Sequence, residues 1–110
     1  MRVAYIFSTT NSHYILSNMI VPQLESGSHG FEVAGMFFFV DNTFMLVKEN
    51  DIGERLSKIA KEKGMLLMGC DRCVLERKIQ DNLVEGATIG CFPDLHSALA
   101  NAGIDQVVTL

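Results

Sequence analysis

Apolar residues follow two alternating patterns along the chain, short continuous runs and stripes with helical spacing. The continuous runs predict five strands, at residues 2–8, 32–40, 65–69, 87–90 and 105–110. The stripes, with apolar residues three or four positions apart, predict helices at residues 12–26, 43–48, 51–63, 71–83 and 93–102. Strands that alternate with helices in this way are typical of an α/β fold, and we expect a three-layer α/β/α sandwich around a five-stranded parallel sheet. The pattern does not determine the order of the strands.

Local signals mark several of the predicted boundaries. Asn11 or Ser12 is expected to cap the first helix, because a short polar side chain accepts hydrogen bonds from the free N–H groups there. The apolar stripe of that helix is predicted to contain Ile15, Met19 and Ile20.

Three consecutive phenylalanines occupy positions 37–39 of the second predicted strand. Successive side chains of a strand point to opposite faces, so we expect both faces of this strand to be buried. Gly64 and Gly103 follow the third and the last predicted helices, where glycine commonly ends a helix.

Composition narrows the classes of fold and function. A length of 110 residues predicts one domain spanning 1–110. Apolar residues make up 48% of the chain, which excludes a disordered polypeptide. Nine basic and thirteen acidic residues give a net charge of −4, so we expect no direct contact with nucleic acid. The apolar runs are far shorter than the roughly 20 residues that span a bilayer, and we expect no membrane span.

Cysteine usage predicts the compartment. Three cysteines are an odd and sparse set for a secreted domain held together by disulfides. The first residues lack the apolar stretch and small-residue cleavage site of a signal peptide. We therefore expect a reducing, cytoplasmic compartment, in which clustered cysteines are more often catalytic or metal-binding than structural.

All three cysteines fall where a predicted strand ends. Cys70 follows the third strand, Cys73 lies one helical turn later, and Cys91 follows the fourth strand. The carboxyl ends of parallel strands form the binding edge of such sheets, so this placement is the main functional signal. A helix beginning directly after Cys70 is expected to stabilise its thiolate, with Arg72 and Arg77 adding positive charge nearby. Such a thiolate attacks sulfur electrophiles and can hold a second sulfur as a persulfide, and Cys70 and Cys73 can also close to a disulfide.

The residues alone leave other functions open. Cys70, Cys73 and Cys91, with His13 or His96, have the ligand types of a four-coordinate zinc or iron–sulfur site. A non-catalytic subunit that presents its surface to a larger assembly is a further alternative. The chain contains no phosphate-binding loop, no dinucleotide-binding glycine motif and no G-x-S-x-G elbow, so nucleotide and serine hydrolysis have no support.

Three stretches resemble the DsrE/DsrF-like family of small sulfur-handling proteins, which includes the TusD-type subunits of sulfur relays. They are FFFVDNTFMLVK at 37–48, MGCDRCVLERKI at 68–79, and the segment from IGCFPDLHSAL at 89–99 to DQVVTL at 105–110. The first is similar to the family's aromatic second strand and acidic turn, and the second to its strand-end cysteine and following helix. Lys78 and Ile79 replace a glycine-containing helix end that is common in the family, and Cys91 stands where relatives commonly have a small residue.

The resemblance implies a function and an assembly. In the family the strand-end cysteine accepts sulfane sulfur as a persulfide, a role that maps onto Cys70, and Cys73 matches members that carry a C-x-x-C pair there. The resemblance therefore implies a sulfur carrier or sulfurtransferase subunit that receives sulfur from a donor protein and passes it to an acceptor protein. It also implies a homo-oligomer, a trimer or a hexamer. We expect no cofactor.

Overall fold

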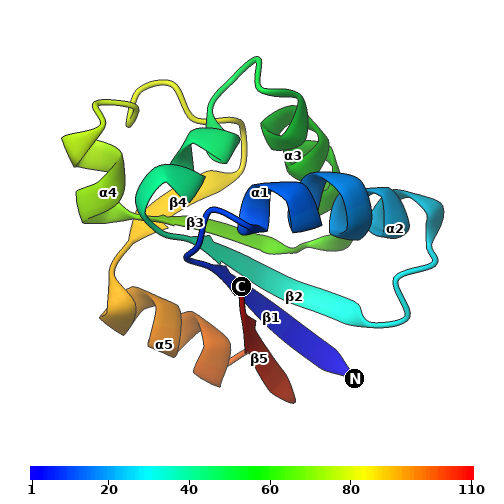
Figure 1. Cartoon of the computed structure of the whole chain (residues 1–110). Helices are drawn as coiled ribbons and strands as arrows, with labels where there is room; N and C mark the ends of the chain where they lie inside the picture. The colour runs from blue at the N-terminus through cyan, green and yellow to red at the C-terminus, as the bar shows by residue number, and fades with distance from the viewer.

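The chain folds around one five-stranded sheet in which every pair of neighbouring strands is parallel (Figure 1). The computed structural model describes all residues, 1–110. The strands are β1 (Arg2–Phe7), β2 (Glu32–Phe38), β3 (Leu66–Cys70), β4 (Ala87–Gly90) and β5 (Gln106–Thr109), in the spatial order β4-β3-β2-β1-β5. The predicted parallel α/β sheet is confirmed. The order of the strands means that the chain crosses the whole sheet between β4 and β5.

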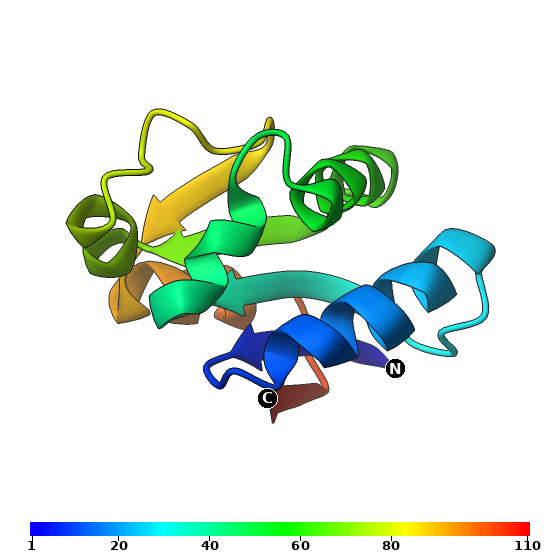
Figure 2. The same cartoon turned by 45° about the horizontal axis from the view of Figure 1, so that its top comes forward.

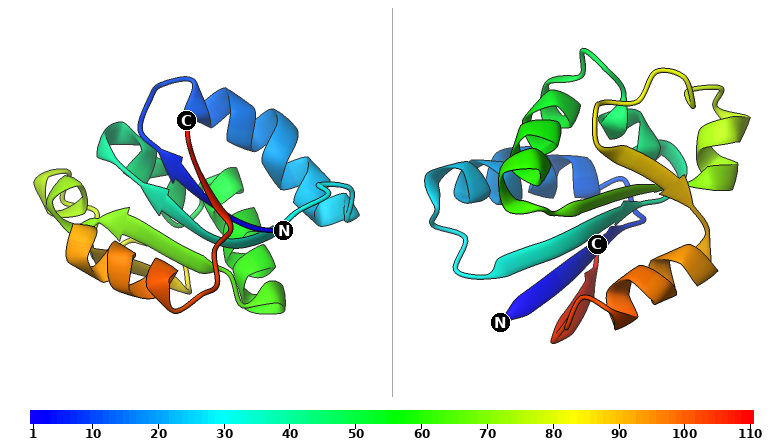
Figure 3. Two further views of the ribbon diagram at one scale, coloured as in Figure 1. Left: turned by 90° about the horizontal axis from the view of Figure 1, so that it is seen from below. Right: turned by 180° about the vertical axis from the view of Figure 1, so that it is seen from behind.

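Helical segments cover the two faces of the sheet unequally (Figures 1 and 2). One face carries α1 (Ser12–Ile15), η1 (Leu16–Ile20), α2 (Val21–Ser26), η2 (Val40–Leu46) and α3 (Asp51–Lys63). The opposite face carries only α5 (Phe92–Ala100), which is seen in front of the sheet from below in Figure 3. The short helix α4 (Asp71–Glu76) lies beyond the carboxyl end of β3. The predicted three-layer arrangement is therefore present, with one layer much thinner than the other.

The three phenylalanines of β2 and its extension lie on both sides of the sheet, as predicted. Phe38 is completely buried on the side of α3, where its ring centroid lies 5.0 Å from that of Phe7. Phe37 is 1% exposed and points to the other side. There it belongs to a smaller apolar cluster, the α5-side cluster, which consists of Phe37, Met68, Cys70, Cys73 and Leu95.

The first helix is continuous from residue 12 to residue 26, as predicted, but it contains a π turn at Leu16–Ile20. The wider turn ends two residues before Pro22, whose ring and missing N–H do not fit a regular α-helical interior. The extra residue rotates the apolar stripe. Met19, which was predicted to be buried, is 46% exposed, and the buried residues are Leu16, Ile20, Val21 and Leu24.

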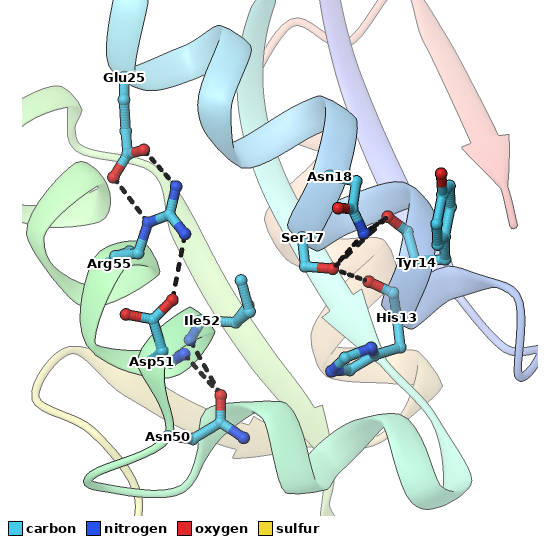
Figure 4. A network of polar contacts seen from close by, with 10 residues as sticks. His13, Tyr14, Ser17, Asn18, Glu25, Asn50, Asp51, Ile52 and Arg55 are labelled. Atoms are coloured by element: carbon cyan, nitrogen blue, oxygen red, sulfur yellow. Dashed lines mark hydrogen bonds and ion pairs between the residues drawn. The ribbon is translucent and has the colours of Figure 1, made fainter.

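The start of the first helix also differs from the prediction. Asn11 occupies the N-cap position, but its side chain makes no capping hydrogen bond. The hydroxyl of Ser12 is buried without a hydrogen-bond partner. A side-chain cap is present instead at another helix, α3. There the Asn50 side chain accepts hydrogen bonds from the N–H groups of Ile52 and Gly53 (Figure 4).

A polar clamp joins α2 to α3 on the surface (Figure 4). The Arg55 Nε atom donates to a carboxylate oxygen of Glu25 at 2.9 Å, and its Nη1 atom donates to Asp51 at 3.1 Å. Arg55 lowers the pKa of the Glu25 carboxyl through this hydrogen bond. The three side chains are partly solvent-exposed, so we expect the clamp to contribute little stability and mainly to set how the helices meet.

Two predicted helices have different bounds. The helix predicted at 71–83 ends at Glu76, because Arg77 closes the turn and Lys78 has a left-handed backbone (φ 56°) that an α-helix cannot contain. Beyond it, Leu83 forms an isolated antiparallel bridge with Val47. The helix predicted at 43–48 is the 3₁₀ segment η2 at Val40–Leu46.

A histidine that the sequence did not single out lies at the amino-terminal edge of the sheet. The two ring nitrogens of His29 face Tyr5 Oη at 2.8 Å and Gln23 Oε1 at 2.9 Å. Burial, and then the charge of Lys63, lower the pKa of His29 below its ordinary value of 6.5. The folded state therefore favours the neutral ring.

This lowered pKa predicts a loss of stability in acid. Between the ordinary pKa and the lower folded pKa of His29, the unfolded chain binds more protons, so the contribution of His29 is complete above about pH 7 and decreases as the pH falls through the folded pKa. Urea unfolding from about pH 7.5 to about pH 5 is expected to show a smaller decrease in the free energy of unfolding for His29→Gln than for wild type. An identical decrease in both proteins would contradict this assignment.

Candidate functional site

Two of the three cysteines line one open depression at the carboxyl edge of the sheet. Cys70 is the last residue of β3, and its register partner on β4 is Gly90, which directly precedes Cys91. The depression has a volume of about 520 Å³ and is lined by Cys70, Asp71, Arg72, Leu75, Cys91 and Phe92. Cys70 lies at its floor, 8% exposed, whereas Cys91 is solvent-exposed. The sheet thus brings together two thiols that are 21 residues apart in sequence.

The close approach of α5 to the sheet depends on Gly90. A Cβ atom at this position would lie 2.9 Å from Asp94 Cβ and 3.0 Å from Met68 Sδ. The absence of a side chain therefore lets the first turn of α5 lie directly against β3 and β4. Asp94 fixes that turn by accepting a hydrogen bond from the N–H of Cys91 at 2.8 Å.

Each of the two buried sulfurs accepts a backbone hydrogen bond. The N–H of Cys73 points to Cys70 Sγ at 3.4 Å. The N–H of Val40 points to Cys73 Sγ at 3.2 Å. Cys73 is 9% exposed and does not line the depression. These donors favour sulfur atoms that carry negative charge.

Val40 adopts an unusual backbone conformation in order to make this contact. Its φ of 49° is left-handed, a region that β-branched residues rarely occupy. Backbone strain of this kind clusters at functional sites, where surrounding contacts maintain it. Here the strained residue supplies the hydrogen bond to Cys73.

The strain at Val40 predicts that a glycine variant is more stable than an alanine variant at this position, the reverse of the usual order. Val40→Gly and Val40→Ala both remove the half-exposed side chain, but only glycine adopts a left-handed φ without steric cost. We expect Val40→Gly to be more stable than Val40→Ala by about 1 kcal/mol, measured by urea unfolding. Elsewhere alanine is normally the more stable residue of this pair. An alanine variant at least as stable as the glycine variant would show that the position is not strained.

The electrostatics of Cys70 differ from the prediction. Burial, and then the hydrogen bond with the side chain of Cys73, raise the pKa of the Cys70 thiol above its ordinary value, against the smaller opposite effect of the Cys73 backbone N–H. The expected stabilisation by a following helix is weak because α4 has only six residues. The charge of Arg77 is also directed elsewhere, since its guanidinium pairs with Asp41 at 2.8 Å and donates to the carbonyl of Cys73.

Arg72 remains the free positive charge at the depression. It is exposed, it lines the depression, and it takes part in none of the ion pairs of the structure. Asp71 lies beside it, but its carboxylate accepts only the Arg72 backbone N–H. The Arg72 guanidinium is therefore available to pair with an anionic group, with the Asp71 carboxylate as the other unpaired charge at the depression.

The predicted histidines do not complete a metal site in this arrangement. His13 on α1 and His96 on α5 are both exposed. No group of three or more His, Cys, Asp or Glu side chains is placed so that it could hold a metal ion. The four-ligand alternative of Cys70, Cys73, Cys91 and a histidine is therefore not assembled.

The sequence interpretation missed two contributors to the site. Val40 was not singled out, because a valine in an apolar run carries no signal of a left-handed backbone. The apolar wall of the depression, Leu75 and Phe92, was also missed, and both side chains are 51% exposed. A large aromatic residue directly before the proline of a helix start is the one signal that could have identified Phe92.

The fold is shared with several solved structures. The chain is similar to the ychN protein from E. coli, with a TM-score of 0.70, 16% identity and coverage of 99% of this chain and 97% of that chain. It is also similar to BT1422, a conserved protein of unknown function from Bacteroides thetaiotaomicron (TM-score 0.69, 15% identity, 98% and 94% coverage). A third similar structure is MTH1491, a protein of unknown function from Methanobacterium thermoautotrophicum (TM-score 0.68, 13% identity, 99% and 97% coverage). Identities this low show a common, YchN-like fold.

No protein-family model and no curated protein matches the chain. None of the helices has the length and apolar character needed to cross a membrane.

Proposed function

We propose that this protein is a sulfur carrier or sulfurtransferase subunit, which accepts sulfane sulfur as a persulfide on Cys70 and passes it to a partner protein. The observation that carries the proposal is the position of Cys70, which ends β3 and lines an open depression. The YchN-like fold and the resemblance of residues 68–79 to the DsrE/DsrF-like family support it.

The chemistry requires only thiols and persulfides. The Cys70 thiolate attacks the outer sulfur of a donor persulfide, the S–S bond of the donor breaks, and the donor leaves as a thiolate. The accepted sulfur extends about 2 Å from Cys70 Sγ. The negative charge of the persulfide is then carried by this outer sulfur rather than by the buried Cys70 Sγ, whose thiol pKa is raised by burial. Cys73 donates its N–H to Cys70 Sγ and holds it in position.

The surroundings of Cys70 favour proteins as donor and acceptor. The side chains of Leu75 and Phe92 are half-exposed beside the depression, and Arg72 is unpaired there. Exposed apolar residues around a reactive group are typical of protein contact surfaces. An acceptor segment with an apolar side chain and a carboxylate would match them.

We also propose a cytoplasmic homo-oligomer, a trimer or hexamer, without a cofactor. The half-exposed Ile89 and Val107 on the two edge strands support an oligomer, and the exposed free thiol of Cys91 supports a reducing compartment. Size-exclusion chromatography with light scattering tests the assembly, and a monomer at all concentrations would count against it.

The central test is sulfur loading. After incubation with glutathione persulfide, intact-protein mass spectrometry is expected to show a gain of one sulfur atom in the wild type and a loss of nearly all of this gain in Cys70→Ser. Ser97→Ala, on the exposed side of α5, serves as the control and is expected to load like the wild type.

Sulfur uptake by Cys70→Ser at the wild-type rate would contradict the assignment. So would a wild-type protein that takes up no sulfur but forms a Cys70–Cys73 disulfide under mild oxidation, since that result would indicate a thiol redox function. A native Cys70 that resists thiol labelling would favour a non-catalytic assembly subunit.

A further inference from the structure

We propose that Cys91 is a second sulfur-carrying residue, which takes the sulfane sulfur from the Cys70 persulfide and presents it to the acceptor. This inference rests on the proposed function and assigns an exit step to the same depression. Neither the fold nor the C-x-x-C motif requires a thiol at position 91.

The geometry of the sheet places the backbones of the two cysteines side by side. Cys70 on β3 is the register partner of Gly90 on β4. Cys91 follows Gly90 and therefore lies one residue beyond the position opposite Cys70. Strands about 4.8 Å apart with a rise of about 3.3 Å per residue place the two Cα atoms about 6 Å apart. That separation lies within the range of roughly 4.4–6.8 Å over which two cysteines can be joined through their sulfur atoms. Both residues line the same depression.

The three cysteines differ in exposure, which assigns them different roles in the transfer of sulfur to the acceptor. Cys70 is 8% exposed at the floor of the depression, and Cys73 is 9% exposed outside it. Cys91 is exposed and lies beside Phe92 at the mouth. An acceptor thiol therefore meets Cys91 with less rearrangement than it needs to approach Cys70. Cys73 is also held by the Val40 N–H, which fixes its sulfur away from the mouth.

The step balances without a further reactant. The Cys91 thiolate attacks the outer sulfur of the Cys70 persulfide, a bond forms between that sulfur and Cys91 Sγ, and the bond to Cys70 Sγ breaks. The electron pair of the broken bond stays on Cys70 Sγ, which takes up the proton released by Cys91. The sulfane sulfur keeps its oxidation state, so the transfer consumes no oxidant and no reductant.

A single-turnover experiment tests this order. The full chain is loaded with glutathione persulfide, separated from the donor and mixed with reduced glutathione as acceptor. The thiols and persulfides are alkylated at successive times and located by peptide mass spectrometry. In the wild type, sulfur is expected first on Cys70 and then on Cys91. In Cys91→Ser, Cys70 is expected to load normally and to discharge about tenfold more slowly, because the intramolecular acceptor is lost.

The variants distinguish chemistry from misfolding. Serine is a favoured residue at a helix N-cap, so Cys91→Ser is expected to melt at or above the wild-type temperature. In Cys70→Ser, Cys91 is expected to load about tenfold more slowly than in the wild type, since its sulfur arrives through Cys70.

Three outcomes would overturn the inference. The first is that sulfur stays on Cys70 without reaching Cys91 and that Cys91→Ser discharges at the wild-type rate. This outcome overturns the exit step and leaves the proposed function intact. A Cys70→Ser variant that loads Cys91 at the wild-type rate overturns the order of the two thiols. No sulfur on Cys70 in any variant overturns the proposed function together with the exit step.

Discussion

Replacing Phe38 by alanine is expected to lower the free energy of unfolding by about 3–5 kcal/mol. Phe38 is completely buried on β2, the central strand of the sheet, and its ring lies against that of Phe7. Truncation removes apolar contacts and leaves a cavity that two flanking strands and the helices above cannot close. Because the stability of a domain is typically about 5–15 kcal/mol, this change alone is expected to unfold a large fraction of the protein.

Urea unfolding followed by circular dichroism measures this effect. Phe31→Ala is the matched control, because the same side chain is removed from a position that is 49% exposed. Its expected cost is below about 1 kcal/mol. Equal losses in the two variants would show that burial of Phe38 does not determine the stability of the sheet.

Replacing Gly53 by alanine is expected to be the most damaging conservative change in a helix, at about 2–3 kcal/mol. Helix propensity favours alanine over glycine by roughly 1 kcal/mol, so a simple propensity argument predicts the opposite sign. The structure overrides it, because a Cβ atom would lie 2.5 Å from the carbonyl oxygen of Met45 and 3.0 Å from that of Val47. Backbone atoms cannot move aside as a flexible side chain can, and α3 must separate from the end of η2.

Gly53→Ala is also expected to change the reactivity of Cys73. Because η2 begins at Val40, its displacement moves the N–H that contacts Cys73 Sγ, so Cys73 is expected to react faster with a thiol reagent in Gly53→Ala. Gly64→Ala is the control, with a left-handed φ but open space around the added atom, and an expected cost of about 1 kcal/mol. A Gly53 variant no less stable than the Gly64 variant would contradict the close contact between α3 and η2.

The sequence pattern was sufficient for the elements and the class of fold. Alternating runs located all five strands, and the triple phenylalanine identified a strand buried on both faces. The pattern failed where backbone geometry rather than hydrophobicity decides the structure. Lys78 ends α4 through a left-handed conformation, and the π turn before Pro22 rotates the apolar stripe away from Met19.

The candidate site could be located only in part. Placing Cys70 at a strand end required only the apolar run before it. Placing Cys91 beside it required the adjacency of β3 and β4, which the pattern does not contain. The raised pKa of Cys70 depends on how deeply its sulfur is buried, and the contact between Val40 and Cys73 joins residues 33 positions apart.

The position of β5 has a consequence for the speed of folding. Strands β1 to β4 pair with their nearest sequence neighbours, so they can assemble progressively as short loops close. β5 must return to β1, and the contacts that secure it, such as those from Arg2 to Ala102 and Asp105, join residues 100 or more positions apart. Contacts between residues so far apart in the sequence slow folding. We therefore expect the rate-limiting event of refolding to be the docking of this last strand, after the other four have already formed their ladder.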